Sequence, residues 1–150
     1  MNESTTPSRA LTLDDIVENR SYEGERNEFR RHIIGLKKRR RVSVGDFITL
    51  LFENRQTMRF QIQEMARVEH LDTDEAIAGE LEAYNPLIPE PGHLSATLFI
   101  ELISDEDLRA WLPKLVGIER SIELRLADGT VIVDTPEAGH EAQLTRDEAT

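Results

Sequence analysis

The sequence contains no cysteine and one tryptophan, and aromatic residues make up 5% of its 150 positions. The absence of cysteine excludes disulfides, thiol nucleophiles and cysteine-held metal or iron–sulfur centres within this chain. No apolar run approaches the roughly 20 residues of a membrane-spanning helix. The N-terminal residues are polar, where a signal peptide would be basic and then apolar. We therefore predict a cytoplasmic protein with an ordinary hydrophobic core and no membrane association.

Positive charge is also scarce, because 18 Lys and Arg residues stand against 29 Asp and Glu residues, a formal net charge of −11. Nucleic-acid binding relies on positive charge to release counterions, so this balance argues against a general nucleic-acid-binding role. The exception is the basic run Lys37–Arg41. Such a run can bind phosphate, nucleic acid or an acidic partner, or it can be a solvated last helical turn, where the dipole favours cations. Cationic last turns are common, which favours the second interpretation.

One apolar segment and the helix pattern that follows it organise the chain. Phe47–Phe52 is apolar except at Thr49, and its length and its β-branched and aromatic content predict a buried strand. Asn54 is suited to cap a following helix, which we predict from Arg55 to about His70. One stripe of that helix is expected to face the core, and it consists of Met58, Ile62, Met65 and Ala66.

The other segments mix helices and strands without a βαβ order. This mixture predicts an α+β fold, a single domain with a largely antiparallel sheet packed with several helices. A hairpin is expected over Ser121–Val133, with Asp128-Gly129 in a type I′ turn. The other expected elements are a short helix from Thr12 to about Asn19, a turn at Tyr22–Gly24, helices over Arg26–Arg39 and Thr73–Tyr84, a strand over His93–Ile103 and a helix from Ser104 that largely buries Trp111.

The chain is expected to be ordered in its middle and flexible near both ends. Residues 1–10 are polar without an apolar period and predict a flexible lead-in, residues 11–133 form the predicted domain, and residues 134–150 are polar, charged and expected to fray. The sequence leaves open whether the chain ends naturally at Thr150 or is truncated there.

Two arginines are candidates for binding a ligand or a partner. Arg55 and Arg59 lie four residues apart and share a helical face. Together they could clamp a carboxylate or a phosphate in bidentate fashion. They could equally pair with acidic residues of the helix over residues 74–82. We favour this second interpretation, because charged helix faces are usually solvated surfaces of ion pairs.

Gln61 and Glu69 are the second pair of candidates, because both fall within or beside the apolar stripe of the central helix. A polar group that faces a core needs a partner, since burying it unpaired costs about 1–3 kcal/mol. The two residues could bind a small ligand or a partner. The favoured hypothesis is structural: each forms a hydrogen bond with a neighbouring loop or helix end, for which we suggest the proline-rich connection Asn85–Pro91.

The sequence shows no signature of catalysis or metal binding. The four histidines are not spaced like metal ligands, and no Gly-rich phosphate loop or nucleophile motif is present. We therefore predict no catalytic residue, no bound metal and no cofactor.

Six strings of the sequence are distinctive when taken together: Leu13–Ile16, Leu36–Arg40, Leu51–Met58, Gln61–Met65, Ala83–Pro89 and Leu94–Phe99. They resemble a bacterial family of uncharacterised proteins, Domain of Unknown Function family 3501, and the resemblance extends from the first predicted helix to Gly117. It implies a cytoplasmic protein that is often encoded beside rubrerythrin-like di-iron proteins and iron–sulfur oxidoreductases. It implies no catalytic residues.

Three functions follow from these patterns, in order of preference. The first is a non-catalytic accessory or interaction protein with a protein partner from a redox, iron–sulfur or di-iron system, and self-association is compatible with it. The second is a small-ligand binder or enzyme that uses the Arg55/Arg59 face or the Gln61/Glu69 pair. The third is nucleic-acid binding through Lys37–Arg41. A deep pocket at Gln61 and Glu69 would favour the second function, and a shallow surface there would favour the first.

Overall fold

The computed structural model describes residues 9–137, and the chain divides into two compact units, formed by residues 1–99 and 100–150. The first unit contains α1 (Asn19–Arg40), β1 (Arg41–Val44), β2 (Ile48–Phe52), α2 (Arg55–Val68), α3 (Asp74–Tyr84) and all but the last residue of β3 (Ala96–Ile100). The second unit contains α4 (Asp105–Trp111), β4 (Glu123–Arg125) and β5 (Val131–Val133). Short 3₁₀ helices occur at Leu13–Asp15, Asn85–Leu87, Leu112–Lys114 and Ile118–Arg120.

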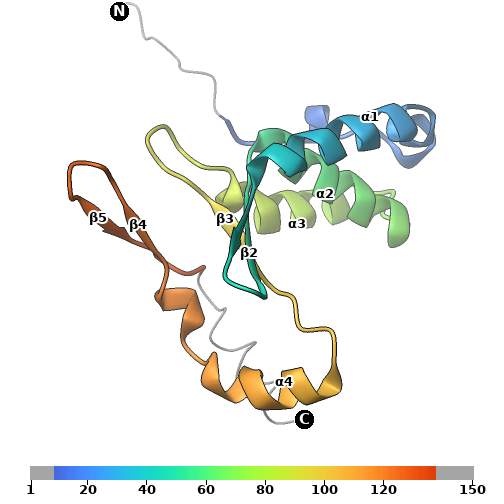
Figure 1. The fold of residues 1–150 in the computed structure, drawn as a ribbon. Helices are drawn as coiled ribbons and strands as arrows, with labels where there is room; N and C mark the ends of the chain where they lie inside the picture. Colours follow the sequence, from blue (N-terminus) through green and yellow to red (C-terminus); the bar gives the residue numbers. More distant parts are fainter. Residues whose placement is uncertain (1–8, 138–150) are drawn as a thin grey trace, which may run out of the picture. The chain divides into compact units, whose positions relative to one another are not determined.

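The first unit combines three helices with a three-stranded sheet in the order β1-β2-β3. Strand β1 is antiparallel to β2, with Arg41 opposite Leu51 and Val44 opposite Ile48. Beyond the end of β2, the Glu53 N–H donates to the Ser95 carbonyl at 2.8 Å. The strands predicted over Phe47–Phe52 and His93–Ile103 are therefore neighbours in one sheet. In Figure 1 the three helices lie side by side, and the sheet begins where α1 ends.

The fold class predicted from the sequence is confirmed, because helices are combined with antiparallel strands in both sheets. Of the predicted lead-in and C-terminal segment, residues 1–8 and 138–150 lie outside the described residues. The described part of the lead-in includes Arg9, whose guanidinium donates to the Pro89 carbonyl at 3.2 Å. No helix in the described part of the chain is both long and apolar enough to cross a membrane.

The core of the first unit forms where α2, α3 and the N-terminal segment meet. Its buried members are Leu11, Met58, Ile62, Leu81 and Ile88. Ala66 is buried as well, so most of the predicted stripe of α2 does face the interior. Asn54 caps α2 as predicted, because its side chain accepts a hydrogen bond from the Thr57 N–H.

Helix α1 differs from its prediction. The expected turn at Tyr22–Gly24 and the separate helix after it are replaced by one helix of 22 residues. Gly24 costs a helix interior about 1 kcal/mol relative to alanine. Tyr22, which is fully buried, more than offsets this cost by burying its ring. The short helix expected from Thr12 to about Asn19 is reduced to a single 3₁₀ turn, Leu13–Asp15.

The hairpin of the second unit lies where the sequence predicts it, but its turn is of another type. Glu123 pairs with Val133 and Arg125 with Val131. A type I′ turn needs a positive φ at both central residues, and only Gly129, with φ of 92°, has one in this loop. The prediction of a type I′ turn is therefore wrong.

The second unit buries less than the sequence predicts. Trp111 is 39% exposed, so the expectation that it is largely buried is wrong. Between residues 100 and 137 no side chain is fully buried. The reason is size, because a seven-residue helix and a hairpin of three-residue strands enclose little volume.

Candidate interaction surface

Arg55 and Arg59 are bound by Arg9 and Asp15 near the N-terminus and by Glu25 of α1. Arg55 forms an ion pair with Asp15 at 2.9 Å and donates to the Arg9 carbonyl at 3.2 Å. Arg59 donates to the Asp15 carbonyl at 3.0 Å and forms an ion pair with Glu25 at 2.8 Å. The prediction that they pair with the acidic helix over residues 74–82 is therefore wrong, although their role as ion-pair donors is as expected.

The segment that occupies these arginines, residues 9–18, is here called the N-terminal strap. Side-chain amides hold it in place at two points, because each amide both accepts from and donates to the same backbone residue. Asn85 bonds in this way to Leu11, at 2.8 and 2.9 Å. Gln63 bonds in this way to Val17, at 2.9 and 3.1 Å. The strap thus obtains from side chains the backbone partners that a strand would obtain from a sheet.

The structural hypothesis for Gln61 and Glu69 is wrong in its choice of residues. Gln61 is half-buried and Glu69 is exposed at the C-terminal end of α2, and neither side chain bonds to a described residue. The bridging glutamine is Gln63, which is fully buried. Asn85, in the connection expected to receive Gln61 and Glu69, bonds instead to Leu11 of the strap. The ligand-binding hypothesis for Gln61 and Glu69 has no support from burial or from bonding.

Helices α1 and α2 are joined by a charged group at their interface. Arg26 donates three hydrogen bonds to the Glu64 carboxylate, and the Tyr22 hydroxyl donates a fourth at 2.9 Å. The Arg26 guanidinium, followed by the Tyr22 hydroxyl, holds the pKa of Glu64 below its ordinary value of 4.5, although partial burial opposes this effect. Burial, with Glu64 as the next cause, raises the pKa of Tyr22. The arrangement favours ionised Glu64 in the folded protein.

This lowered pKa predicts a pH dependence of stability. A carboxylate whose pKa is lower in the folded than in the unfolded state stabilises the fold above its unfolded pKa, and this contribution is lost as the pH falls through the folded pKa. We expect Glu64→Gln to be less stable than the wild type at neutral pH, with a difference that shrinks below about pH 4.5. Urea unfolding across this range measures it. Asp15 and Asp128 also have lowered pKa values. Because both residues are present in the wild type and in the variant, they do not contribute to the difference between the two proteins. A constant difference across the range would contradict the role of Glu64.

The candidate site residues do not line the concavity that the structure shows at one end of α1 and α2. One open concavity of about 440 Å³ lies between the start of α1 and the end of α2. It is lined by Asn19, Arg20, Glu23, Arg67, Val68 and His70. Neither Gln61 nor Glu69 lines it, and Arg67 is already paired with Glu23. Among the described residues, no three His, Asp or Glu side chains lie close enough together to hold a metal ion.

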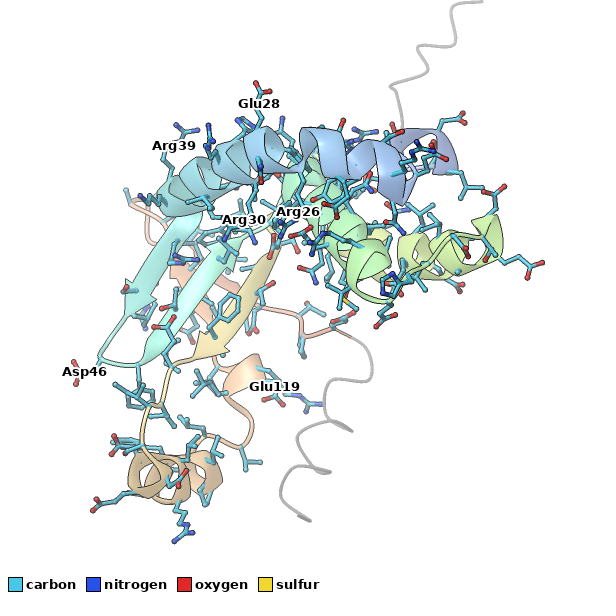
Figure 2. The ribbon with its side chains drawn as sticks, turned by 90° about the vertical axis from the view of Figure 1, so that its right-hand side faces the viewer. Arg26, Glu28, Arg30, Arg39, Asp46 and Glu119 are labelled. Atoms are coloured by element: carbon cyan, nitrogen blue, oxygen red, sulfur yellow. The ribbon has the colours of Figure 1, made fainter. Side chains whose placement is uncertain are left out.

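A group of cations in the second half of α1 and at the start of β1 is arranged differently. Arg30, Arg31, Lys38 and Arg41, here called the basic face, are all exposed, and none has an ion pair to a described residue. Arg39 is also exposed, but Figure 2 shows it on the opposite side of α1 from Arg30, which lies near Arg26.

The neighbouring cations Lys37 and Arg40 have structural roles instead. The Lys37 ammonium lies 5.3 Å from the centre of the Phe60 ring. Arg40 donates to the carbonyls of Phe52 and Glu53, at 2.8 and 3.3 Å. The predicted run Lys37–Arg41 therefore divides into side chains that stabilise the fold and side chains that are free to bind.

Comparison with known proteins shows the family to which the chain belongs. Residues 10–149 match the family model described as "Protein of unknown function (DUF3501)". The chain belongs to this family. The DUF3501 assignment agrees with the resemblance seen in the sequence strings, which is thereby confirmed. No curated protein shows significant sequence similarity to this DUF3501 chain.

A solved structure is similar to this DUF3501 chain in both sequence and fold. It is the crystal structure of a novel protein of unknown function from Burkholderia pseudomallei K96243, which is 38% identical in sequence with a TM-score of 0.82. The match covers 93% of this chain and 70% of that one. The family and the fold are thus established, and the function has to be argued from the surface.

Proposed function

We propose that the protein is a non-catalytic interaction protein whose basic face binds an acidic surface on another protein. The observation that supports this is the segregation of charge. Residues 30–41 hold seven of the 18 Lys and Arg residues and no Asp or Glu. The other 138 residues hold eleven Lys and Arg and all 29 Asp and Glu, a formal charge of −18. A compact positive surface on such a chain favours complementary partners and raises their association rate.

The helix dipole explains the positions of only some of the cations on the basic face. Its effect falls off within the last turn of a helix, and Arg30 and Arg31 lie more than two turns before the end of α1 at Arg40. Cations elsewhere in the first unit show what internal pairing looks like, because Arg26 and Arg59 both have carboxylate partners within 3 Å. The basic face lacks such partners among the described residues, so its charge is available to another molecule.

The apolar content of this surface favours a protein, rather than a nucleic acid, as the binding partner. Ile34 is 40% exposed on the helical face that it shares with Arg30, Arg31 and Lys38. An apolar anchor surrounded by charges is typical of protein interfaces. Base stacking would need exposed aromatic rings, but the nearby Phe29 packs against another ring, with centres 5.7 Å apart. A nucleic acid longer than the patch would also meet the negative charge of the other residues.

The sequence resemblance adds an expectation about the partner, which is a redox or iron–sulfur protein. The proposal itself concerns only the chemistry of the partner surface, which is acidic with an apolar centre. The alternative, a small-ligand binder using Arg55 and Arg59, is less favoured because the strap already occupies both guanidinium groups. Nucleic-acid binding through Lys37–Arg41 becomes a measurable outcome of the same experiment.

We expect the variant Arg31→Glu/Lys38→Glu to bind an acidic probe at least about tenfold more weakly than the wild type, which corresponds to about 1.4 kcal/mol. The probe is a fluorescein-labelled synthetic peptide of alternating glutamate and leucine, and binding is measured by fluorescence anisotropy at about 0.15 M ionic strength, where the Debye length is about 8 Å. Reversing two central charges replaces attraction with repulsion at the patch.

The matched control for this variant is Arg20→Glu/Arg109→Glu. Both of its residues are exposed cations outside the basic face, and the variant changes the net charge by the same amount. We expect its affinity to stay within about twofold of the wild type, because long-range charge alone is largely screened. Equal losses in the two variants would contradict a localised site. Tighter binding of a DNA oligonucleotide than of the peptide, lost in the same variant, would support the nucleic-acid alternative.

The natural partner can be tested in the cells that make the protein. A photo-crosslinking amino acid at Ile34 is expected to capture protein segments rich in Asp and Glu, identified by mass spectrometry. The same amino acid at Ala78, which is exposed on the acidic helix α3, serves as the control. A redox cofactor in the captured protein would support the expected partner class, and capture of RNA or DNA at Ile34 would contradict the proposal.

A further inference from the structure

The hairpin of β4 and β5 is a two-stranded sheet, and within the described residues no third strand joins either side of it. A two-stranded hairpin is marginally stable in water, and a free strand edge is a template for pairing with another chain. Large apolar side chains are exposed on both strands, namely Leu124, Val131, Ile132 and Val133. The hairpin therefore has both the backbone groups and the apolar surface to add further strands.

The register of the hairpin determines which backbone groups are free. At one end the Leu126 N–H donates to the Thr130 carbonyl at 2.8 Å, and at the other the Asp134 N–H donates to the Ile122 carbonyl at 3.0 Å. In an antiparallel pair, alternate residues of a strand bond to the same neighbour. The residues between these positions on β4 therefore direct their backbone groups to the outer edge.

Glu123 and Arg125 are these outward-bonding residues of β4. Each presents one N–H and one C=O at the free edge. Their side chains lie on the same face of the hairpin, and their charged groups are 3.3 Å apart. The outer edge of β4 thus carries a negative charge, an apolar residue and a positive charge in sequence.

We propose that β4 pairs antiparallel with β4 of a second copy of the chain, centred on Leu124. This register places Glu123 opposite Arg125 of the partner subunit, and Arg125 opposite Glu123 of the partner subunit. Each of these is a doubly hydrogen-bonded pair, so all four outward backbone groups of each strand find partners. The result is a four-stranded sheet with twofold symmetry, in which the same surface meets itself.

The side chains agree with this register on both faces. On one face the two Glu–Arg pairs combine with the 3.3 Å pair within each strand, so each charge has opposite charges as neighbours, which favours a network over isolated pairs. On the other face Leu124 meets its own equivalent, and Ile122 meets Leu126 of the partner subunit. Leu124 and Leu126 are 42% and 44% exposed in the single chain, so pairing removes apolar surface from water.

Among the edge strands in the described residues, β4 is distinguished by carrying two opposite charges. Strand β1 carries one charge, Arg41, and β3 and β5 carry none. Self-pairing of those strands gains no complementary charges. A charge on an edge strand usually prevents pairing. On β4 the two charges instead make one antiparallel register favourable and oppose shifts that would place like charges together.

The test uses charge reversal and its rescue, with mass measured by sedimentation equilibrium. The interface is small, so dissociation constants in the micromolar to millimolar range are expected and the wild type is measured over that range. We expect the wild type to approach twice the chain mass of 17.1 kDa. Arg125→Glu alone and Glu123→Arg alone should each remain at the single-chain mass, because each places like charges opposite one another.

An equimolar mixture of the two single variants distinguishes this pairing from other contacts. Their edges are opposite in charge, so we expect the mixture to regain twice the chain mass. The double variant Glu123→Arg/Arg125→Glu should also regain it, because the pairs are only exchanged. Circular dichroism verifies that each variant is folded. A wild type that stays at the single-chain mass, single variants that still self-associate, or a mixture that stays at the single-chain mass would each overturn the proposal.

Discussion

Replacing Gln63 with methionine is expected to lower the free energy of unfolding by about 2–4 kcal/mol, because leaving a buried polar group unpaired costs about 1–3 kcal/mol and two part-buried groups lose their partners. The two groups are the N–H and the carbonyl of Val17, which now bond to the Gln63 side chain at 2.9 and 3.1 Å. Methionine has a similar length and keeps the apolar contacts of the buried site. Urea unfolding monitored by circular dichroism measures the change.

The matched control is Gln61→Met on the same helix. Gln61 is half-buried and bonds to no described residue, so its replacement should change the free energy of unfolding by less than about 0.5 kcal/mol. Because the chemical change is identical, the difference between the variants isolates the bond to the strap. Similar losses in both would show that burial at α2, rather than pairing with Val17, controls stability.

Removing the carboxylate of Glu53 is expected to have an effect of similar size. Glu53 is 5% exposed, and its two oxygens accept hydrogen bonds from the hydroxyls of Thr57 on α2 and Thr97 on β3. Hydrogen bonds to a carboxylate contribute about 1.5–3 kcal/mol each. We therefore expect Glu53→Ala to lower the free energy of unfolding by about 3–5 kcal/mol, measured by urea unfolding.

Two further variants make this prediction specific. Glu53→Gln keeps one acceptor oxygen and the shape of the side chain, so its loss should be smaller than that of Glu53→Ala. Glu101→Ala removes an exposed carboxylate near the end of β3 and should change stability by less than about 0.5 kcal/mol. If Glu53→Ala were no more destabilising than Glu101→Ala, Glu53 would not join β2, α2 and β3 as inferred.

Local sequence patterns were sufficient to predict much of the secondary structure of the first unit. The apolar run at Phe47–Phe52 identifies β2, because few other structures accommodate such a run in six residues. The stripe through Met58, Ile62 and Ala66 identifies the buried side of α2 because burial repeats with the helical period. The cap at Asn54 depends only on its immediate neighbours. Each of these features is determined within about one element, which is why the sequence reveals it.

The choice between Gln61 and Gln63 could not be made in this way. At about 100° per residue, the two lie on opposite flanks of Ile62, at equal angles from it. What distinguishes them is the strap, whose Val17 lies 46 residues earlier in the sequence. No periodicity within α2 reports the position of a distant segment. The same reason explains why Arg55 and Arg59 pair with Asp15 and Glu25 rather than with α3.

The basic face was visible in the sequence as a run of cations, but its extent was not. Lys37 and Arg40 belong to the run yet interact with Phe60 and with backbone carbonyls. Arg30 and Arg31 lie outside the run yet share its exposed surface. Contiguity in sequence is a poor guide to a surface on a helix, because neighbouring residues point in different directions.

The N-terminal strap has a consequence for biosynthesis. Its partners come much later in the chain, since Leu11 bonds to Asn85, 74 residues away, and Arg9 to the Pro89 carbonyl, 80 residues away. Translation proceeds from the N-terminus at about 5–20 residues per second, so the strap leaves the ribosome several seconds before these partners exist. Closing such long loops is also entropically costly. The strap therefore docks only after α3 has been made, and until then the core position of Leu11 stays empty.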